Sequence, residues 1–389
     1  MRSRARKSPL RHLVWILPLL VLDFFLFRWL ALRQGGCRPA PTPLPVPAET
    51  ALETPRPPPP VWQAMVPPTP QTNLLNPDEP GVLMPTASGR LESAKYGSTR
   101  TVKRGSRFVA SFHEGVDIAP VERDRRGIAT DPVFAVAAGR VAFVNSSAGA
   151  SNYGKYVVIE HDDPSLGQAA RRDGAMEPAV VYTLYAHLAD IRFGIRPGKN
   201  VEAGEPIGTL GSTSNTRPPI PAARAHLHWE IGVMLHARYD VRSREQKTQN
   251  PFGVYNGGNL FGFDPLDFYA AHTRDPGLTL ATYIASVPPA VEIVLRGRTP
   301  DYFRRFPALW SGLPHDGGPM WMAVSESGIP LAGRNASASE IQTLGNRRQA
   351  VLRVDPDVLG RNGRGLVTQI RGAWDFSVRG RQWADLLLY

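Results

Sequence analysis

The sequence predicts a mainly β protein with antiparallel sheets. Between residues 81 and 271 the chain consists of short apolar runs, rich in β-branched and aromatic residues, that Gly, Asn, Asp or Pro interrupts. Runs of this length and composition are typical of strands, and no long stretch repeats with the period of a helix. With 389 residues the chain is long enough for two domains of ordinary size. The clearest runs are "DPVFAVAAGRVAFVNS", "GKYVVIEH", "AVVYTLYAHL" and "EPIGTLG".

Residues 1–37 have the composition of a cytoplasmic tail and membrane anchor. Arginines and a lysine crowd positions 2–11, and the following apolar stretch is long enough to span a bilayer. The flanking positive charges predict a cytoplasmic N-terminus and an exported remainder. Asp23 and Arg28 would be costly inside a bilayer, and a cleaved signal segment or lipid attachment at Cys37 are the alternatives that stay open.

Residues 38–80 are predicted to form a proline-rich linker. The stretch "RPAPTPLPVPAETALETPRPPPPVWQAMVPPTP" holds many of the 38 prolines of the chain. Such a segment favours extended polyproline conformations and acts as a semi-rigid spacer. The alternative is a proline-rich ligand for the aromatic groove of a partner protein.

Two further domains are expected, at 81–272 and at 273–389. Within the first, residues 162–178 and 212–225 look like loop insertions. The second contains "AVEIVLRGR", "PMWMAVSES", "QAVLRVDPD" and "GAWDFSVRGRQWADLLLY", which read as strands of a smaller β-rich domain of unknown role. Its tryptophans are expected in a core, with a carbohydrate platform as the alternative, and they are Trp310, Trp321, Trp374 and Trp383.

Charge and cysteine content restrict the partners and the metal sites. The formal net charge of +11 permits an anionic partner such as nucleic acid, anionic lipid or a cell-wall polymer. No basic run is interleaved with aromatic residues and no zinc-finger spacing occurs, so no nucleic acid is expected. Cys37 is the single cysteine, which excludes an internal disulfide and a cysteine-ligated metal. Any metal site must therefore use histidines and carboxylates.

Histidines gather in three stretches of the central region, "FHEGVD", "YAHL" and "HLHWEI". In a strand successive side chains point to opposite faces, so His226, His228 and Glu230 would share one face. Catalytic zinc commonly takes three nitrogen or oxygen ligands and keeps a fourth position open for water. If the three stretches converge in space, they can form such a site.

Five motifs in this order resemble the lysostaphin-like, LytM-type zinc metallopeptidases of family M23, which are peptidoglycan endopeptidases. The motifs are "FHEGVDIA", "YGKYVVIEH", "YTLYAHL", "GEPIGTLG" and "HLHWEI", and the resemblance covers about residues 81–236, including "GRLESAKYGSTR". It implies an antiparallel β-sheet peptidase domain with a groove. A single His-x-His would be a weak signal, whereas five ordered motifs with every polar position filled are specific.

The resemblance also implies a role for each motif residue. His113, Asp117 and His228 correspond to the ligands of one zinc ion per chain. His187 and His226 correspond to the catalytic histidines, which would relay the proton of a zinc-activated water and stabilise the tetrahedral intermediate. Which of the two acts as general base stays open.

Residues near the five motif residues are expected to have supporting roles or no role in the site. Glu230 is a candidate to orient a histidine through a hydrogen bond. Glu114 is expected to be only a loop residue, and His161 and His236 are not expected to be ligands, although His161 is a candidate for the groove rim. The segment 212–225 departs from the family, which has a shorter glycine-rich turn there, so this loop would reshape or cover the groove.

The resemblance implies peptidoglycan as substrate, cleaved within its stem or cross-bridge peptides. The expected protein is a zinc endopeptidase anchored in the inner membrane by its N-terminal segment, with the catalytic domain in the periplasm, or secreted if the signal is cleaved. Two alternatives stay open, a non-enzymatic regulator of cell-wall amidases and a wall-binding or assembly protein built on a peptidase-like scaffold. A regulatory protein that binds the C-terminal domain or the linker is a further candidate partner.

Overall fold

The computed structural model describes residues 61–104, 107–170, 176–360 and 363–389. Contacts group Pro58–Tyr389 into one compact unit. The predicted anchor, the candidate lipidation site and the linker up to residue 60 lie outside the described residues. Within the described ranges no helix is both long and apolar enough to cross a membrane.

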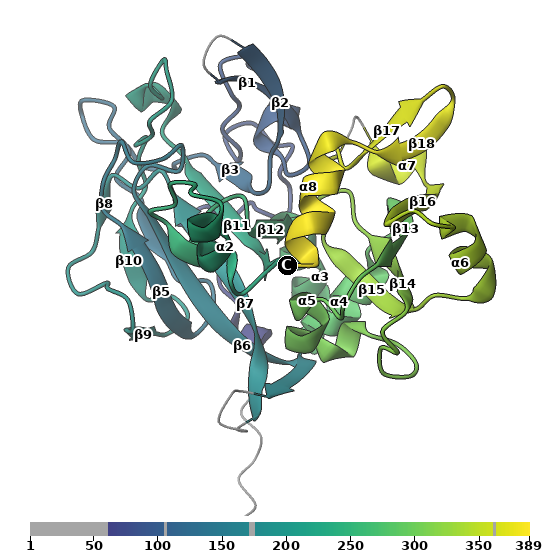
Figure 1. Cartoon of the computed structure of the whole chain (residues 1–389). Coiled ribbons are helices and arrows are strands. Elements are labelled where there is room, and N and C mark those ends of the chain that lie inside the picture. Colours follow the sequence, from purple (N-terminus) through teal and green to yellow (C-terminus); the bar gives the residue numbers. More distant parts are fainter. Residues whose placement is uncertain (1–60, 105–106, 171–175, 361–362) are drawn as a thin grey trace, which may run out of the picture. The chain divides into compact units, whose positions relative to one another are not determined.

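The largest element is a seven-stranded antiparallel sheet (Figure 1), so the prediction of a mainly β, antiparallel fold is confirmed. The short strand β3 pairs with one end of the central strand β11. Six strands follow one another across the sheet in the order β12 (Leu260–Phe263), β11 (Leu227–Met234), β7 (Met176–Ala186), β6 (Tyr156–Ala170), β5 (Gly139–Asn145) and β9 (Asn200–Val201), and the seventh is β3 (Val116–Ile118).

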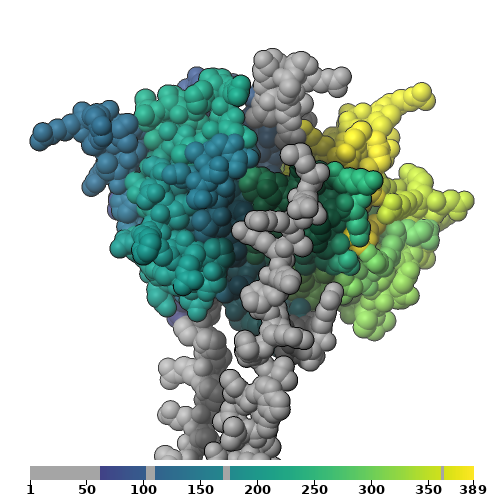
Figure 2. All heavy atoms as spheres, turned by 60° about the vertical axis from the view of Figure 1, so that its left-hand side comes forward, coloured from purple at the N-terminus to yellow at the C-terminus, as the bar shows by residue number. Residues whose placement is uncertain are grey.

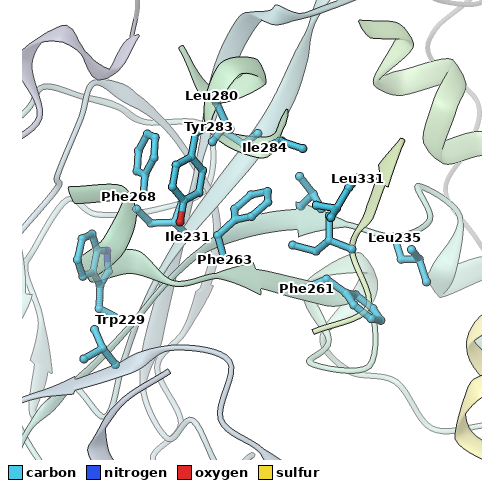
Figure 3. Close-up of a cluster of buried hydrophobic side chains, with 14 of the residues drawn as sticks. Trp229, Ile231, Leu235, Phe261, Phe263, Phe268, Leu280, Tyr283, Ile284 and Leu331 are labelled. Atoms are coloured by element: carbon cyan, nitrogen blue, oxygen red, sulfur yellow. The ribbon is translucent and has the colours of Figure 1, made fainter. Parts of the chain in front are cut away.

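Strand β11 is buried along its whole length because both of its faces are covered. On one face Trp229 and Ile231 enter a cluster with Phe263 of β12 and with aromatic and aliphatic side chains of two nearby helices, as Figure 3 shows. The other face carries His228 and Glu230. A strand buried on both faces is held rigidly, which suits an element that positions polar side chains.

Two smaller antiparallel elements flank this sheet (Figure 1). One is the hairpin of β1 (Thr99–Arg104) and β2 (Arg107–Phe112), which leads directly into His113. The other is a three-stranded sheet of β4 (Pro132–Phe134), β10 (Pro206–Thr209) and β8 (Asp190–Ile191).

The C-terminal region contains a four-stranded antiparallel sheet, a hairpin and several helices. The sheet runs in the order β15 (Pro330–Asn335), β14 (Pro319–Val324), β13 (Val291–Arg296) and β16 (Gln349–Val354), and the hairpin joins β17 (Val367–Ile370) and β18 (Ala373–Phe376). The α-helices within the described residues are α2 (Tyr239–Glu245), α3 (Pro265–Arg274), α4 (Leu280–Ser286), α5 (Asp301–Arg305), α6 (Ala338–Leu344), α7 (Pro356–Leu359) and α8 (Val378–Leu387).

One hydrophobic cluster runs through the peptidase-like region and the C-terminal region. Helix α4 contacts both β6 of the large sheet and β15 of the C-terminal sheet. In the space-filling view the C-terminal residues, light green to yellow, lie beside the teal and green residues of the large sheet (Figure 2). The predicted boundary between residues 272 and 273 therefore does not separate two independent cores.

The predicted linker differs from the structure at residues 61–80. The ring of Trp62 is 1% exposed, and its Nε1 donates a hydrogen bond to Oδ2 of Asp163 at 2.7 Å. Leu74 is also buried in the main cluster. These apolar residues lie between the prolines and pack against the large sheet, so this part of the chain is not a spacer.

Two further local predictions were wrong. Residues 162–178 were expected as a loop, but the described residues of this range, 162–170 and 176–178, extend the paired strands β6 and β7, whose register shifts between Asp163 and Gln168. The residues after Ser377 were expected as a strand, yet they form α8, because the Ser377 hydroxyl caps the helix and the buried side chains Trp383 and Leu387 fall on one helical face.

The C-terminal tryptophans favour a structural role. Trp383 is 5% exposed, and its Nε1 donates to the carbonyl oxygen of Gly328. Trp310, Trp321 and Trp374 are partly buried and pack against the main hydrophobic cluster. Tryptophans placed in this way are core residues rather than an exposed platform.

Candidate metal centre and active site

The pairing of β11 brings together residues that lie far apart in the sequence. His228 stands opposite Asp117 of β3 on one side and opposite Ala186 of β7 on the other. His187 follows β7 directly, and His113 follows β2. The register of one strand therefore collects all three histidine-bearing stretches at one end of the sheet.

His113, Asp117 and His228 present three ligand atoms to one point. The distances are 3.1 Å between His113 Nε2 and Asp117 Oδ1, 3.0 Å between the same Nε2 and His228 Nδ1, and 3.0 Å between that Nδ1 and Asp117 Oδ1. Tetrahedral zinc ligands at about 2.0–2.1 Å from the ion lie about 3.3–3.4 Å apart. The triangle is thus slightly smaller than a zinc site requires, and its two nitrogens and one oxygen fit the ligand preference of zinc.

The outward nitrogen of each histidine in this triangle is bound to an acceptor. His113 Nδ1 donates to the carbonyl oxygen of Lys95 at 2.8 Å, and His228 Nε2 donates to Oε1 of Glu230 at 2.8 Å. These partners select the tautomer that leaves a lone pair on the nitrogen facing the triangle. The candidate role of Glu230 as the group that orients a histidine fits this geometry.

Glu230 is fully buried and receives two more hydrogen bonds. The hydroxyl of Tyr153 donates to Oε1 at 2.7 Å, and that of Tyr182 donates to Oε2 at 3.0 Å. Burial acts to raise the pKa of Glu230, but His228 and the two tyrosines outweigh burial and lower it. The carboxylate is therefore ionised and strengthens the basicity of the His228 ring.

His187 and His226 form a second pair beside the triangle. Their ring centroids are 4.7 Å apart, and Nε2 of His226 lies 3.6 Å from Oδ2 of Asp117. Nδ1 of His187 donates to the carbonyl oxygen of Thr213, and Nδ1 of His226 donates to that of Arg224, each at 2.8 Å. In each ring Nε2 is consequently the nitrogen available for proton exchange.

The backbone of His187 adopts a conformation that is uncommon for this residue type. Its φ angle of 62° lies in the left-handed region. Its amide donates to the carbonyl oxygen of Tyr153, and its ring is bound to Thr213. Such a backbone is held by its surroundings and is common at functional sites.

Residues 111–242 match the model of peptidase family M23. The chain carries a peptidase family M23 domain. His113, Asp117, His187, His226 and His228 all lie inside the matched range. No curated protein matches the chain.

Three solved structures illustrate what the M23 domain is similar to. A zinc-containing peptidase from Vibrio cholerae is 25% identical over 36% of this chain and 32% of that chain, with a TM-score of 0.23. The catalytic domain of the antimicrobial peptidase lysostaphin from Staphylococcus simulans is 22% identical over 45% and 87%, with a TM-score of 0.25. The catalytic domain of the prophage-encoded M23 protein EnpA from Enterococcus faecalis is 23% identical over 36% and 82%, with a TM-score of 0.21. The chain thus spans about a third of the Vibrio protein, and the family assignment rests on the match of residues 111–242.

Burial controls the protonation of the second histidine pair in the M23 domain. It holds the pKa of His187 well below its ordinary value, and the neighbouring histidines lower it further. Burial likewise lowers the pKa of His226. Both rings are therefore neutral near pH 7, and each can accept a proton.

Asp117 is ionised although it is 1% exposed. Burial acts to raise its pKa, but the guanidinium of Arg100 and the ring of His113 outweigh burial and hold the pKa well below the ordinary value. Arg100 Nη2 donates to Oδ2 of Asp117 at 2.5 Å, which leaves Oδ1 for a metal ion. Burial also acts to lower the pKa of His228, but the bonds with Asp117 and Glu230 raise it to about 9, so a metal ion at Nδ1 would displace a proton.

The five motif residues are nearly closed off from solvent, since none is more than 9% exposed. Three side chains of the connection between β11 and β12 (residues 235–259) cover part of this sheet face, where they pack against Tyr156 and Tyr182; they are Phe252, Val254 and Tyr255. A row of ring contacts runs from His228 to Tyr153 at 5.6 Å, to Tyr156 at 5.4 Å, and to Phe252 of this connection at 6.1 Å. Two directly paired strands need only a short turn, and so long a connection is typical of a functional segment.

Several residues of the site were not predicted from the sequence. Tyr153, Tyr182 and Arg100 lie in the quoted motifs but received no role, because their spacing gave no sign that the tyrosines bind Glu230 and that Arg100 binds Asp117. Glu114 was expected to be only a loop residue, but it pairs with Arg364 of the C-terminal region at 2.6 Å.

His161 is not at the rim of the groove. Its ring is fully buried on the opposite sheet face, where Nδ1 donates to the carbonyl oxygen of Ala138 and Nε2 accepts from the hydroxyl of Thr183. His236 lies at the start of the connection that follows β11. Among the described residues neither histidine belongs to the group that could hold a metal ion.

Proposed function

We propose that this protein is a zinc-dependent endopeptidase that hydrolyses stem or cross-bridge peptides of bacterial peptidoglycan. The observation that carries the proposal is the triangle of His113 Nε2, Asp117 Oδ1 and His228 Nδ1 beside two neutral histidines. The M23 match supports a peptidase of this kind. Peptidoglycan as substrate rests on the resemblance of the ordered motifs and on the positive net charge, which suits an anionic wall polymer.

Zinc held by His113, Asp117 and His228 would supply Lewis-acid activation of water and of the scissile carbonyl. His226 would take the proton of the attacking water at Nε2, and Asp117 Oδ2, 3.6 Å away, would stabilise the imidazolium. His187 offers a second unprotonated Nε2 at the same site, which would accept a hydrogen bond from the attacking water and help to orient it. The carbonyl oxygens of Thr213 and Arg224 keep both rings in this orientation.

A direct experiment incubates the purified full chain with isolated peptidoglycan and resolves the released peptides by mass. The proposal predicts one zinc per chain and new peptide termini, which disappear after chelation and in His113→Ala and His226→Ala. A chain without bound zinc would refute the metal site, whereas cleavage that survives chelation would refute the mechanism.

The location of the enzyme is part of the same proposal. The basic and apolar residues 1–37 would anchor the chain in the inner membrane and leave the M23 domain in the periplasm, where peptidoglycan lies. Fractionation of cells expressing the full chain, with protease treatment of spheroplasts, tests this. Degradation of the M23 domain from outside is expected, and protection would refute the predicted orientation.

The closed site favours a second candidate function. Because the five motif residues are at most 9% exposed and residues 235–259 cover part of the sheet face, the domain would suit a non-enzymatic regulator of cell-wall amidases. Stoichiometric zinc without any cleavage, together with stimulation of an amidase by the added chain, would favour this alternative.

A further inference from the structure

The loop that carries metal ligand His113 has no room to move on its inner side. A Cβ on Gly115 would lie 2.3 Å from the carbonyl oxygen of Trp229, and a Cβ on Gly262 would lie 2.3 Å from that of Glu114. Glycine at both positions is what lets the loop approach β11 and β12 so closely. The position of His113 therefore depends on how this loop is held on its outer side.

Arg364 of the C-terminal region holds that side through Glu114. Its Nη2 lies 2.6 Å from Oε1 of Glu114, and both side chains are 15% exposed. The same guanidinium donates to the carbonyl oxygens of Gly257 and Leu260, and it lies 3.6 Å from the ring centroid of Phe261. A planar guanidinium that donates to several fixed acceptors is held rigidly in one position.

A second C-terminal arginine contacts the strand that leads into the ligand. Arg379 of α8 donates through Nη2 to the carbonyl oxygen of Ala110 in β2 at 2.7 Å. The C-terminal region thus contacts the chain on both sides of His113, through a hydrogen bond three residues before it and an ion pair one residue after it.

The buried environment of Glu114 makes the site sensitive to loss of the ion pair with Arg364. Glu114 binds Arg364 through Oε1. Its other oxygen, Oε2, is buried and has no hydrogen-bond partner within the described residues. Loss of the guanidinium would leave a mostly buried carboxyl group without its partner, and such a group forces its surroundings to rearrange.

From these contacts we infer that Arg364 is a positioning residue for the metal centre, acting through Glu114 on the ligand His113. The C-terminal region then contributes to metal binding by the M23 domain. This inference rests on the proposed zinc site, and it assigns that site a dependence on residues outside the range that matches the family.

The test measures the zinc dissociation constant of the full chain by competition with a chromophoric chelator. Arg364→Gln is expected to weaken zinc binding by about 10–100-fold, the range typical of residues that orient metal ligands. Arg364→Lys keeps the charge but loses the fork, so an intermediate loss is expected. Arg353→Gln is the matched control, because Arg353 pairs with Glu292 within the C-terminal region and its side chain is 68% exposed, so this variant should bind zinc like the unaltered chain.

Glu114→Gln removes the other partner of the same ion pair and keeps the size of the side chain. A similar loss of zinc affinity is expected, and the double variant should fall no more than about threefold below Arg364→Gln, because residues that act as one unit are not additive. Thermal unfolding of the zinc-free variants reports separately on folding.

The outcomes separate the two proposals. If Arg364→Gln and Glu114→Gln unfold at lower temperature yet bind zinc as tightly as the unaltered chain, the ion pair only stabilises the fold. The positioning role is then refuted. If the unaltered chain itself binds no zinc, the proposed function fails, and the positioning role fails with it.

Discussion

The buried carboxylate of Glu230 accepts a hydrogen bond from Nε2 of His228 at 2.8 Å, on the side of the ring opposite the metal-facing Nδ1. Strand geometry explains the contact, since residues two apart on β11 share a face. A single strand thereby supplies a ligand and the group that fixes its tautomer.

Glu230→Gln should weaken zinc binding by about 10–100-fold, because the amide keeps the shape but removes the charge that makes the His228 ring more basic. The measurement is the zinc dissociation constant from chelator competition. Glu160→Gln is a suitable control, since Glu160 also accepts a tyrosine hydroxyl, from Tyr255, but is not bound to a metal ligand. Equal zinc affinities for the Glu230 and Glu160 variants would contradict the role of Glu230.

Substitution of the two classes of histidine should separate metal binding from catalysis. His113→Ala is expected to lose zinc, whereas His226→Ala should keep zinc and lose about 10²–10⁴-fold in peptidase rate, the usual contribution of general acid–base groups. Metal content by mass spectrometry and peptide release report the two properties. Loss of zinc in His226→Ala would show that this residue is a ligand instead.

Trp62→Phe should lower the free energy of unfolding by about 1.5–3 kcal/mol, the range for a hydrogen bond to a charged group. The reason is that the indole Nε1 donates to the buried carboxylate of Asp163. Urea denaturation measures the change. Trp310→Phe removes an indole bond at an exposed carbonyl and should cost less than about 1 kcal/mol. Equal changes in the free energy of unfolding for the two variants would show that residues 61–80 do not pack stably against the large sheet.

His161 should make the protein less stable in mild acid. Burial lowers its pKa from the ordinary value of 6.5 to about 4 in the folded protein. Between these values the unfolded chain binds more protons, so the free energy of unfolding falls as the pH drops from 6.5 towards 4. The slope from this group is at most about 1.4 kcal/mol per pH unit.

His161→Gln should reduce that slope by the same amount. The measurement is urea denaturation at several pH values in the presence of a chelator, so that metal ligands contribute equally to both proteins. An unchanged slope would contradict the assignment.

Removal of residues 275–389 should abolish folding of the M23 domain. Leu280, Ile284 and Leu331 belong to the same hydrophobic cluster as Trp229 and Phe263 (Figure 3). The truncated chain would expose this cluster to water and is expected to be insoluble or to lack cooperative unfolding. A soluble, cooperatively folded product would show that the two regions fold independently.

Some features of this protein follow from the sequence alone. The alternation of side chains along β11 places His228 and Glu230 on one face whatever the fold around it, and His226 directly precedes this strand. The short runs broken by turn residues indicate antiparallel strands, and the ordered motifs identify His113, Asp117 and His187 as their companions.

Only the tertiary structure decided the rest, because the remaining contacts join residues whose separation in the chain carries no local signal. The pair of Glu114 and Arg364, the bond of Trp62 to Asp163, and the partial cover formed by residues 235–259 depend on how distant segments pack. The same holds for the shared core of the M23 domain and the C-terminal region. Local sequence patterns fix strands and faces, whereas the free energy of burial, summed over the whole chain, fixes which faces meet.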